Sequence, residues 1–105
     1  MEHIELRFAG GTNKGSLPWA IAGVVGSGNL EVMIEQALSD SGTFVVVDTA
    51  VKGFREVWQA VLQRFVARHG IGGIHISIND GGATPAVVAL RLDQALATFK
   101  QESHE

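Results

Sequence analysis

The stretch 54–66 carries apolar side chains at helical spacing, and this pattern constrains the fold more than any other feature. The apolar residues recur three and four positions apart, as on one face of an α-helix. They are Phe54, Val57, Trp58, Val61, Leu62, Phe65 and Val66. Charged and amide side chains occupy the other positions apart from Ala60, and glycines at 70, 72 and 73 supply a stop. The sequence therefore predicts an amphipathic helix with one continuous stripe on the core.

Four segments before this helix have the patterns of β-strands. Residues 3–8 alternate apolar with polar side chains, and in 30–35 Leu30, Val32 and Ile34 alternate with Glu31, Met33 and Glu35, which is typical of strands with one buried face. Residues 43–49 are rich in β-branched side chains and suit an inner strand. Residues 17–25 form an apolar run, predicted to be a largely buried strand that pairs with 30–35 as a hairpin.

Two further elements follow the helix. Residues 74–79 alternate again, which predicts a fifth strand with a polar outer side. Thr84 can cap a last helix, and Pro85 suits its first position. A strand over 87–92 stays open as an alternative, although the cap and the apolar face that continues to Phe99 favour the helix. We expect an α+β fold, a two-layer sandwich whose mixed or mostly antiparallel sheet has about five strands, with two helices on one face.

Composition limits the classes of function. The 105 residues suit a single domain, 1–105, with one core. A net charge of -3 argues against binding a phosphate backbone, and the chain has no cysteine, hence no disulfide and no thiolate nucleophile or ligand. Its start is unlike a signal peptide, and its longest apolar run is too short to span a bilayer. A cytoplasmic protein is expected.

The stretch 23–33 places a lone hydroxyl between two apolar runs. Ser27 stands between Gly26 and Gly28, and glycine accepts the positive φ of a tight hairpin turn. We expect a two-residue turn with Ser27 exposed at the tip, open to close approach by an enzyme or a bulky substituent. The plain alternative is a turn with an incidental serine, because such residues dominate turns generally.

A serine hydrolase is a second hypothesis. Its parts would be Ser27 as nucleophile, His75 or His3 as base, and Asp48 or Asp80 as orienting group. The nucleophile-elbow pattern needs glycine two residues before and after the serine, but the chain has Val25 and Asn29 there. No motif brings these groups together, so no catalytic residue is assigned.

Metal and phosphate sites are not supported by the spacing of the residues that could form them. The histidines, His3, His69, His75 and His104, are scattered, and no metal site is predicted. Residues 9–16 are rich in glycine but lack the Gly-Lys-Ser/Thr ending of a phosphate-binding loop, so they are interpreted as a mobile surface connection.

Two segments, taken together, resemble a known family. Residues 25–32 read Val-Gly-Ser-Gly-Asn-Leu-Glu-Val, and residues 80–92 read Asp-Gly-Gly-Ala-Thr-Pro-Ala-Val-Val-Ala-Leu-Arg-Leu. In this order and spacing they resemble the acyl-carrier (delta) subunit of bacterial malonate decarboxylase and, more distantly, the acyl-carrier subunit of citrate lyase. They bracket about two thirds of the chain.

The resemblance implies a carrier that is not itself an enzyme. Ser27 would be joined by a phosphodiester to phosphoribosyl-dephospho-coenzyme A (phosphoribosyl-dephospho-CoA), whose thiol carries acetyl and malonyl as thioesters. The implied partners are acyl transferase and decarboxylase subunits and a prosthetic-group transferase. Asn29 departs from the acidic residue common at that position but leaves the acceptor hydroxyl intact. A citrate lyase-type carrier, a serine hydrolase and an interaction domain stay open as alternatives.

Overall fold

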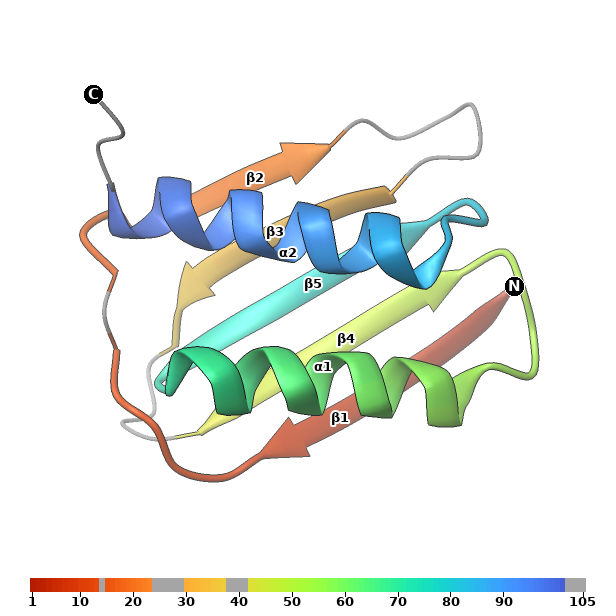
Figure 1. Cartoon of the computed structure of the whole chain (residues 1–105), viewed down its shortest axis with the longest axis horizontal. Coiled ribbons are helices and arrows are strands. Elements are labelled where there is room, and N and C mark those ends of the chain that lie inside the picture. The colour runs from red at the N-terminus through yellow and green to blue at the C-terminus, as the bar shows by residue number, and fades with distance from the viewer. Residues whose placement is uncertain (14, 24–29, 38–41, 102–105) are drawn as a thin grey trace.

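The computed structural model describes residues 1–13, 15–23, 30–37 and 42–101. Within them, five strands form one sheet and two helices cover one of its faces (Figure 1). The elements are β1 Glu2–Phe8, β2 Trp19–Gly23, β3 Leu30–Gln36, β4 Thr43–Thr49, α1 Arg55–His69, β5 Ile74–Asp80 and α2 Pro85–Lys100. The predicted α+β two-layer fold is confirmed.

The sheet has the strand order β1-β4-β5-β3-β2. Neighbouring strands are antiparallel except β4 and β5, which are parallel and are connected through α1. The predicted inner strand is confirmed, because β4 lies between β1 and β5 and buries Val45 and Val47 completely. The core lies between the sheet and the helices, so alternate strand residues face it while the other sheet face carries partly exposed side chains.

The prediction of a largely buried strand over 17–25 is wrong. The strand covers Trp19–Gly23 and forms one edge of the sheet. Trp19 is 55% exposed and Ile21 44% exposed, whereas Ala20 between them is buried. Alternation along a strand places these two large side chains on the face opposite the helices. An apolar run in the sequence does not show whether one or both faces of the resulting strand are covered by another layer.

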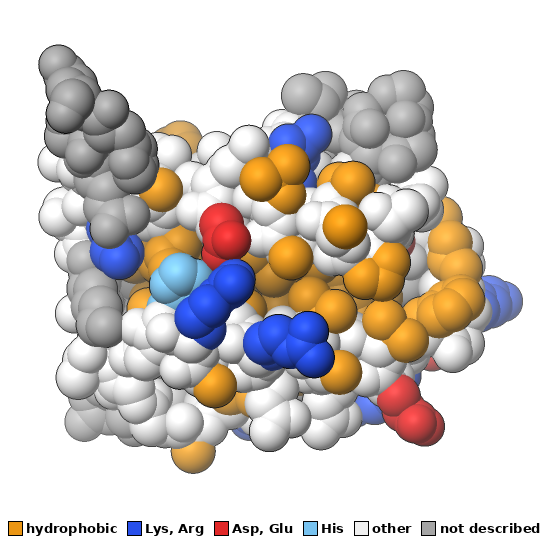
Figure 2. Space-filling view, in the orientation of Figure 1, with side chains coloured by type: hydrophobic (Ala, Val, Ile, Leu, Met, Phe, Trp, Pro, Cys, Tyr) orange, Lys and Arg blue, Asp and Glu red, His pale blue; other side chains and the backbone are white. Residues whose placement is uncertain are grey.

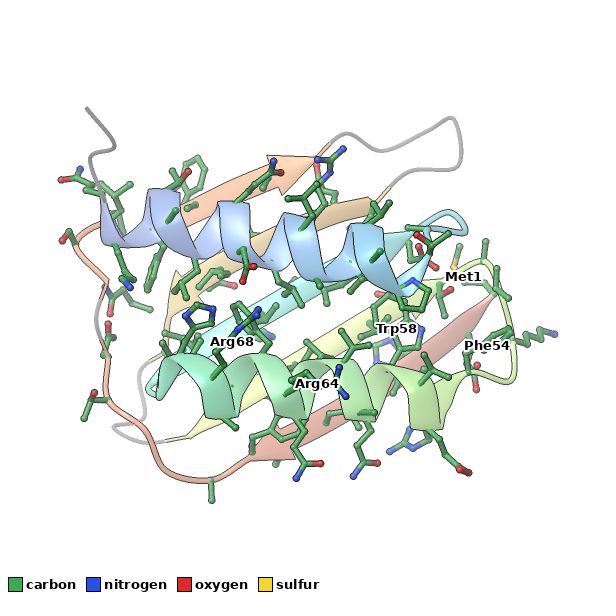
Figure 3. The ribbon with its side chains drawn as sticks, in the orientation of Figure 1. Met1, Phe54, Trp58, Arg64 and Arg68 are labelled. Atoms are coloured by element: carbon green, nitrogen blue, oxygen red, sulfur yellow. The ribbon has the colours of Figure 1, made fainter. Side chains whose placement is uncertain are left out.

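The predicted stripe of the first helix is narrower than expected. Trp58, Leu62, Phe65 and Val66 are buried, but Phe54 and Val57 are exposed. Figure 3 shows Phe54 and Trp58 at the start of α1, with Phe54 at the outer end. Phe54 and Val57 line an open pocket instead of the closed core, because the first turn lies at the rim of the helical layer. The helix ends as predicted, at Gly70 in the left-handed conformation, with its N–H donating to the Val66 carbonyl.

The last helix begins as its sequence predicts, which excludes a strand over 87–92. The Thr84 hydroxyl oxygen accepts a hydrogen bond from the Val87 N–H at 3.3 Å, and Pro85 is the first helical residue. The five residues of the predicted apolar face are all buried. They are Val88, Leu92, Ala95, Leu96 and Phe99.

The connection before β2 forms backbone hydrogen bonds with residues at the ends of both helices. The expectation of a mobile loop did not include these bonds. The Thr12 N–H donates to the Gly70 carbonyl at 3.1 Å, and the Gly72 N–H donates to the Thr12 carbonyl at 2.9 Å. Further along, the Ser16 N–H donates to the Phe99 carbonyl at 2.9 Å. These bonds fix the path of the chain from the end of α1 to the end of α2, where β2 begins.

Candidate functional site

The predicted hairpin of the two segments around Ser27 is confirmed by the pairing of β2 with β3. The strands are antiparallel, and Gly23 at the end of β2 is the register partner of Glu31 in β3. Ser27 lies four residues from each of these partners along the chain. Ser27, Gly26 and Gly28, together with the expected two-residue turn, lie outside the described residues. The site is therefore built from the base of the hairpin.

The base of the hairpin packs closely against α2. Gly23 has a φ of +97°, which favours glycine. A Cβ atom at this position would lie 2.0 Å from the Leu30 carbonyl oxygen and 3.2 Å from Cδ of Arg91. Only a residue without a side chain fits here. The side chain of Arg91 consequently lies directly beside the point where the chain leaves β2.

Arg91 has an incomplete set of hydrogen bonds. Its Nη1 donates to Oε1 of Gln94 at 3.0 Å, whereas its Nε is buried and has no hydrogen-bond partner. Buried donors in folded proteins nearly always have an acceptor. A guanidinium with a free donor is a group that binds anions, phosphate and carboxylate in particular.

Sequence reasoning assigned no role to Arg91, although a signal was present. Arg91 follows Val88 by three residues and precedes Ala95 by four, so it lies on the side of α2 that carries the buried residues. A charged side chain on the buried side of a helix is expected to have an acceptor or an ion-pair partner. The register of the distant hairpin, which brings Gly23 beside it, is not readable from local sequence.

His3 and Asp48, two of the hydrolase candidates, meet at the β1–β4 pair. The His3 Nδ1 lies 2.7 Å from Oδ1 of Asp48, and its Nε2 lies 3.0 Å from Oε2 of Glu5. Hydrogen bonds with Glu5 and Asp48 raise the pKa of His3 above its usual value, because both carboxylates favour the protonated ring. Both ring nitrogens are thus engaged. β1 forms the sheet edge opposite to β2.

His75 lies at the far end of the hairpin strands. Its register partner is Glu35, and the His75 Nδ1 lies 3.5 Å from Oε1 of that residue. Its ring also packs on Phe44, with centroids 5.1 Å apart. Glu35 is separated from the start of β3 at Leu30 by most of the strand, so His75 is placed away from the connection that contains Ser27. The described histidines form no triad with the candidate aspartates.

Asp80 organises the turn between β5 and α2. Its Oδ2 accepts a hydrogen bond from the buried Thr49 hydroxyl at 2.7 Å. Its Oδ1 accepts from the backbone N–H groups of Gly82 at 3.1 Å and Ala83 at 2.8 Å. Both carboxylate oxygens are therefore used to hold the chain before the Thr84 cap. The structure supports the helix-start interpretation of this segment.

An apolar pocket of about 310 Å³ opens between the first turns of the two helices. Its apolar lining includes Val51, Phe54, Val57, Val61 and Val88. Figure 2 shows apolar side chains gathered in a band along the groove between the helices. The pocket also contacts Thr49 and Asp80, whose side chains bond to each other. This lining suits burial of an apolar group.

Among the described residues, no group of three or more His, Cys, Asp or Glu side chains is arranged to bind a metal ion. Neither α1 nor α2 is long and apolar enough to cross a membrane.

Comparison with known proteins places the chain among malonate decarboxylase subunits. The sequence profile described as malonate decarboxylase delta subunit (MdcD) matches residues 19–99. The malonate decarboxylase acyl carrier protein of Burkholderia cepacia is 50% identical over 97 residues, which are 92% of this chain and 89% of that protein. The protein of the same name from Stenotrophomonas maltophilia (strain K279a) is 49% identical over 103 residues, 94% of each chain.

A solved structure has the same fold. It is a chain of a Pseudomonas malonate decarboxylase hetero-tetramer in complex with malonate, with a TM-score of 0.83 and 35% sequence identity. The match covers 94% of this chain and 99% of that one. The resemblance inferred from residues 25–32 and 80–92 is thus confirmed over almost the whole chain. The chain belongs to the family of malonate decarboxylase delta subunits, the acyl carrier proteins of that system.

Proposed function

We propose that this chain is the acyl carrier subunit of a malonate decarboxylase. In this proposal Ser27 carries phosphoribosyl-dephospho-CoA through a phosphodiester, and the thiol of that group carries acetyl and malonyl thioesters. The observation that supports it most is the hairpin: the Gly-Ser-Gly segment of the family lies between the register partners Gly23 and Glu31. Along the chain, Ser27 therefore stands between the two paired strands, four residues from each of these partners.

The residues around the hairpin base fit a phosphodiester. Such a group carries a negative charge and needs hydrogen-bond donors, and Arg91 supplies a cation with an unused Nε beside Gly23. When bound, the group supplies the thiol that the cysteine-free chain lacks. The chain's own residues hold the strands at the base of the hairpin and position a cation near its root.

The carrier itself is proposed to be non-catalytic. His3 bonds Asp48 and Glu5 at one sheet edge, and His75 faces Glu35 at the far end of β3, so neither is a base at the hairpin. Acyl exchange and decarboxylation would then belong to acyl transferase and decarboxylase subunits, and attachment to a prosthetic-group transferase. The whole chain, 1–105, would act as one cytoplasmic carrier domain.

Intact mass of the protein isolated from its native host tests this proposal. We expect the mass of the chain plus one phosphoribosyl-dephospho-CoA group, free or acylated, and loss of the acyl part with hydroxylamine, which cleaves thioesters. A chain of unmodified mass in cells that are degrading malonate would contradict the proposal. Co-purification with citrate lyase subunits instead of malonate decarboxylase subunits would identify the alternative carrier.

A further inference from the structure

We infer that the groove between α1 and α2 is the docking site for an acidic amphipathic helix of a partner subunit. An apolar side chain of that helix enters the pocket between the first turns of α1 and α2, and a carboxylate of the same helix pairs with Arg64. The inference rests on the proposed function, because a carrier that performs no chemistry must bind the subunits that do. It adds the binding surface and the chemistry of the segment that binds there.

The first support is that exposed apolar side chains gather at one end of the groove. Phe54, Val57 and Val51 are all exposed, and all three line the pocket. Single exposed apolar side chains are normal on a protein surface, whereas a contiguous group of them is a feature of interaction sites. Figure 2 shows the apolar band that runs between the helices, with Lys or Arg side chains beside it. This end of the helical layer is therefore suited to bind an apolar group.

The second support is that the charged residue of the pocket is already fully used. Oδ2 of Asp80 accepts from the Thr49 hydroxyl at 2.7 Å, and its Oδ1 accepts from the N–H groups of Gly82 and Ala83. Pockets for small ligands normally combine an apolar lining with a few polar groups that fix the orientation of the ligand. This carboxylate cannot act in that way without losing its own bonds. An apolar side chain of a protein, oriented by contacts outside the pocket, fits the lining better.

The third support is a cation without a partner next to the pocket. Arg64 is exposed and forms no ion pair or hydrogen bond with any residue that the structure describes. It follows Val57 by seven positions and Val61 by three, so it lies on the same side of α1 as these two pocket residues (Figure 3). Arg68, four positions further, pairs with Asp93 at 3.1 Å, which shows that this side of α1 faces α2. The unused guanidinium of Arg64 can bind a carboxylate.

The charge of α1 favours an acidic partner. The helix has Arg55, Arg64 and Arg68 but one acidic residue, Glu56, although the whole chain has a net charge of -3. Across the groove, the carboxylate of Asp93 is already engaged by Arg68 and by the His69 ring. Opposite charges across an interface raise the rate of association and fix the register of the partners. An acidic segment therefore complements this surface, and a basic one is repelled by it.

The distance from the pocket to Arg64 defines the sequence pattern of the partner. An α-helix rises about 1.5 Å per residue, so the separations of three and seven residues from Val61 and Val57 span about 5 to 10 Å along α1. A partner helix that lies along the groove covers the same distance with an apolar and an acidic residue one or two turns apart. Amphipathic helices bind in apolar grooves through such regularly spaced side chains.

Binding of the carrier to the other malonate decarboxylase subunits of the same organism, purified without it, tests the inference. Phe54→Ser removes an apolar side chain of the pocket. Ile21→Ser is its control, because Ile21 is exposed to a similar extent, 44% against 49%, on the sheet face opposite the helices. Arg64→Gln removes the cation, and Gln63→Glu is its control. Gln63 lies on the side of α1 toward β1, beside Arg7, and its substitution changes the net charge by the same amount.

Isothermal titration calorimetry gives the dissociation constants of the folded variants. We expect Phe54→Ser to weaken binding about tenfold or more, as at the centre of an interface. Arg64→Gln should weaken it about three- to tenfold, and less at high salt, because an exposed charge pair is screened. Both controls should bind like wild type. Unchanged binding of the two groove variants would overturn the inference and leave the proposed function standing. A wild type that binds none of these subunits would overturn the proposed function itself.

Photo-crosslinking identifies the occupant without relying on a loss of binding. Val57→benzoylphenylalanine places a photoreactive group at the pocket, and Ile21→benzoylphenylalanine is the control on the opposite face. With the same purified subunits, we expect the first variant to capture a partner segment that has an Asp or Glu one or two helical turns from the captured residue. Capture of a second copy of this chain, capture of a segment without such an acid, or crosslinking from position 21 alone would overturn the inference.

Discussion

The two sides of α2 differ in whether their side chains find partners within the described structure. Toward the sheet, Val88, Leu92 and Phe99 are buried in a closed apolar layer. Toward the hairpin base, Arg91 has a buried donor that no described residue satisfies. The apolar layer is closed, whereas Arg91 lacks an acceptor for its Nε among the described residues. We therefore expect substitutions in the core to change the free energy of unfolding, and substitutions at the hairpin to change attachment of the prosthetic group.

The largest effect is expected in the core, where α1 packs on the sheet. Trp58 is only 6% exposed in the core, so Trp58→Ala should lower the free energy of unfolding by about 3–5 kcal/mol. Val57, the preceding residue in the helix, is 41% exposed, and Val57→Ala should cost less than about 1 kcal/mol. Urea unfolding of both variants measures the difference. Equal losses would show that the boundary between the core and the open pocket is misplaced.

A smaller effect is expected at the turn before α2. Asp80→Ala removes the acceptor of the Thr49 hydroxyl and of two backbone N–H groups. It should cost about 2–3 kcal/mol, because one buried and two partly buried donors lose their partner. Asp93→Ala removes an exposed ion pair with Arg68 and a contact with the His69 Nε2, and should cost about 1 kcal/mol or less. Thermal or urea unfolding distinguishes them. If Asp80→Ala were as mild as Asp93→Ala, the turn would not depend on this network.

The smallest effect is a pH dependence at the β1–β4 pair. The carboxylates of Glu5 and Asp48 raise the pKa of His3, so the folded state holds that proton more tightly than the unfolded state does. The resulting stabilisation is present below the unfolded pKa of about 6.5 and is lost as the pH rises through the folded value. NMR titration of the His3 ring should give a midpoint above that reference. A midpoint at or below it would contradict the contacts at 2.7 and 3.0 Å.

Sequence patterns were sufficient to predict the strands and helices, because periodicity and capping are local properties of the chain. Alternation identified three of the strands, and β-branched content identified β4. The Thr84–Pro85 pair identified the start of α2, because capping is a local interaction. The exposure of individual apolar side chains was not predictable from these patterns. Ile21 lies in an apolar run and Phe54 begins an apolar helical stripe, yet each is exposed because the sheet edge and the helical rim leave one side uncovered.

The candidate site was predictable only in part. The attachment serine comes from the resemblance of residues 25–32 to the family, with the glycines on either side as a local signal. The placement of Arg91 beside Gly23 depends on the packing of α2 over β2, a contact between residues 68 positions apart. Such a contact has no periodic signature. The same holds for His3 and Asp48, which are brought together by strand pairing.

The measurement that tests the account most directly is site mapping of the loaded chain. Wild type, Ser27→Ala and the control Ser16→Ala are incubated with the cognate transferase and its activated cofactor precursor, then digested and analysed by mass spectrometry. Ser16 lies in the connection before β2, where its hydroxyl donates to the Lys100 carbonyl at 3.3 Å. We predict modification of the peptide containing Ser27 in wild type and Ser16→Ala, and none in Ser27→Ala, whose free energy of unfolding should change by less than about 0.5 kcal/mol. Modification at another residue, or undiminished loading of Ser27→Ala, would contradict the account.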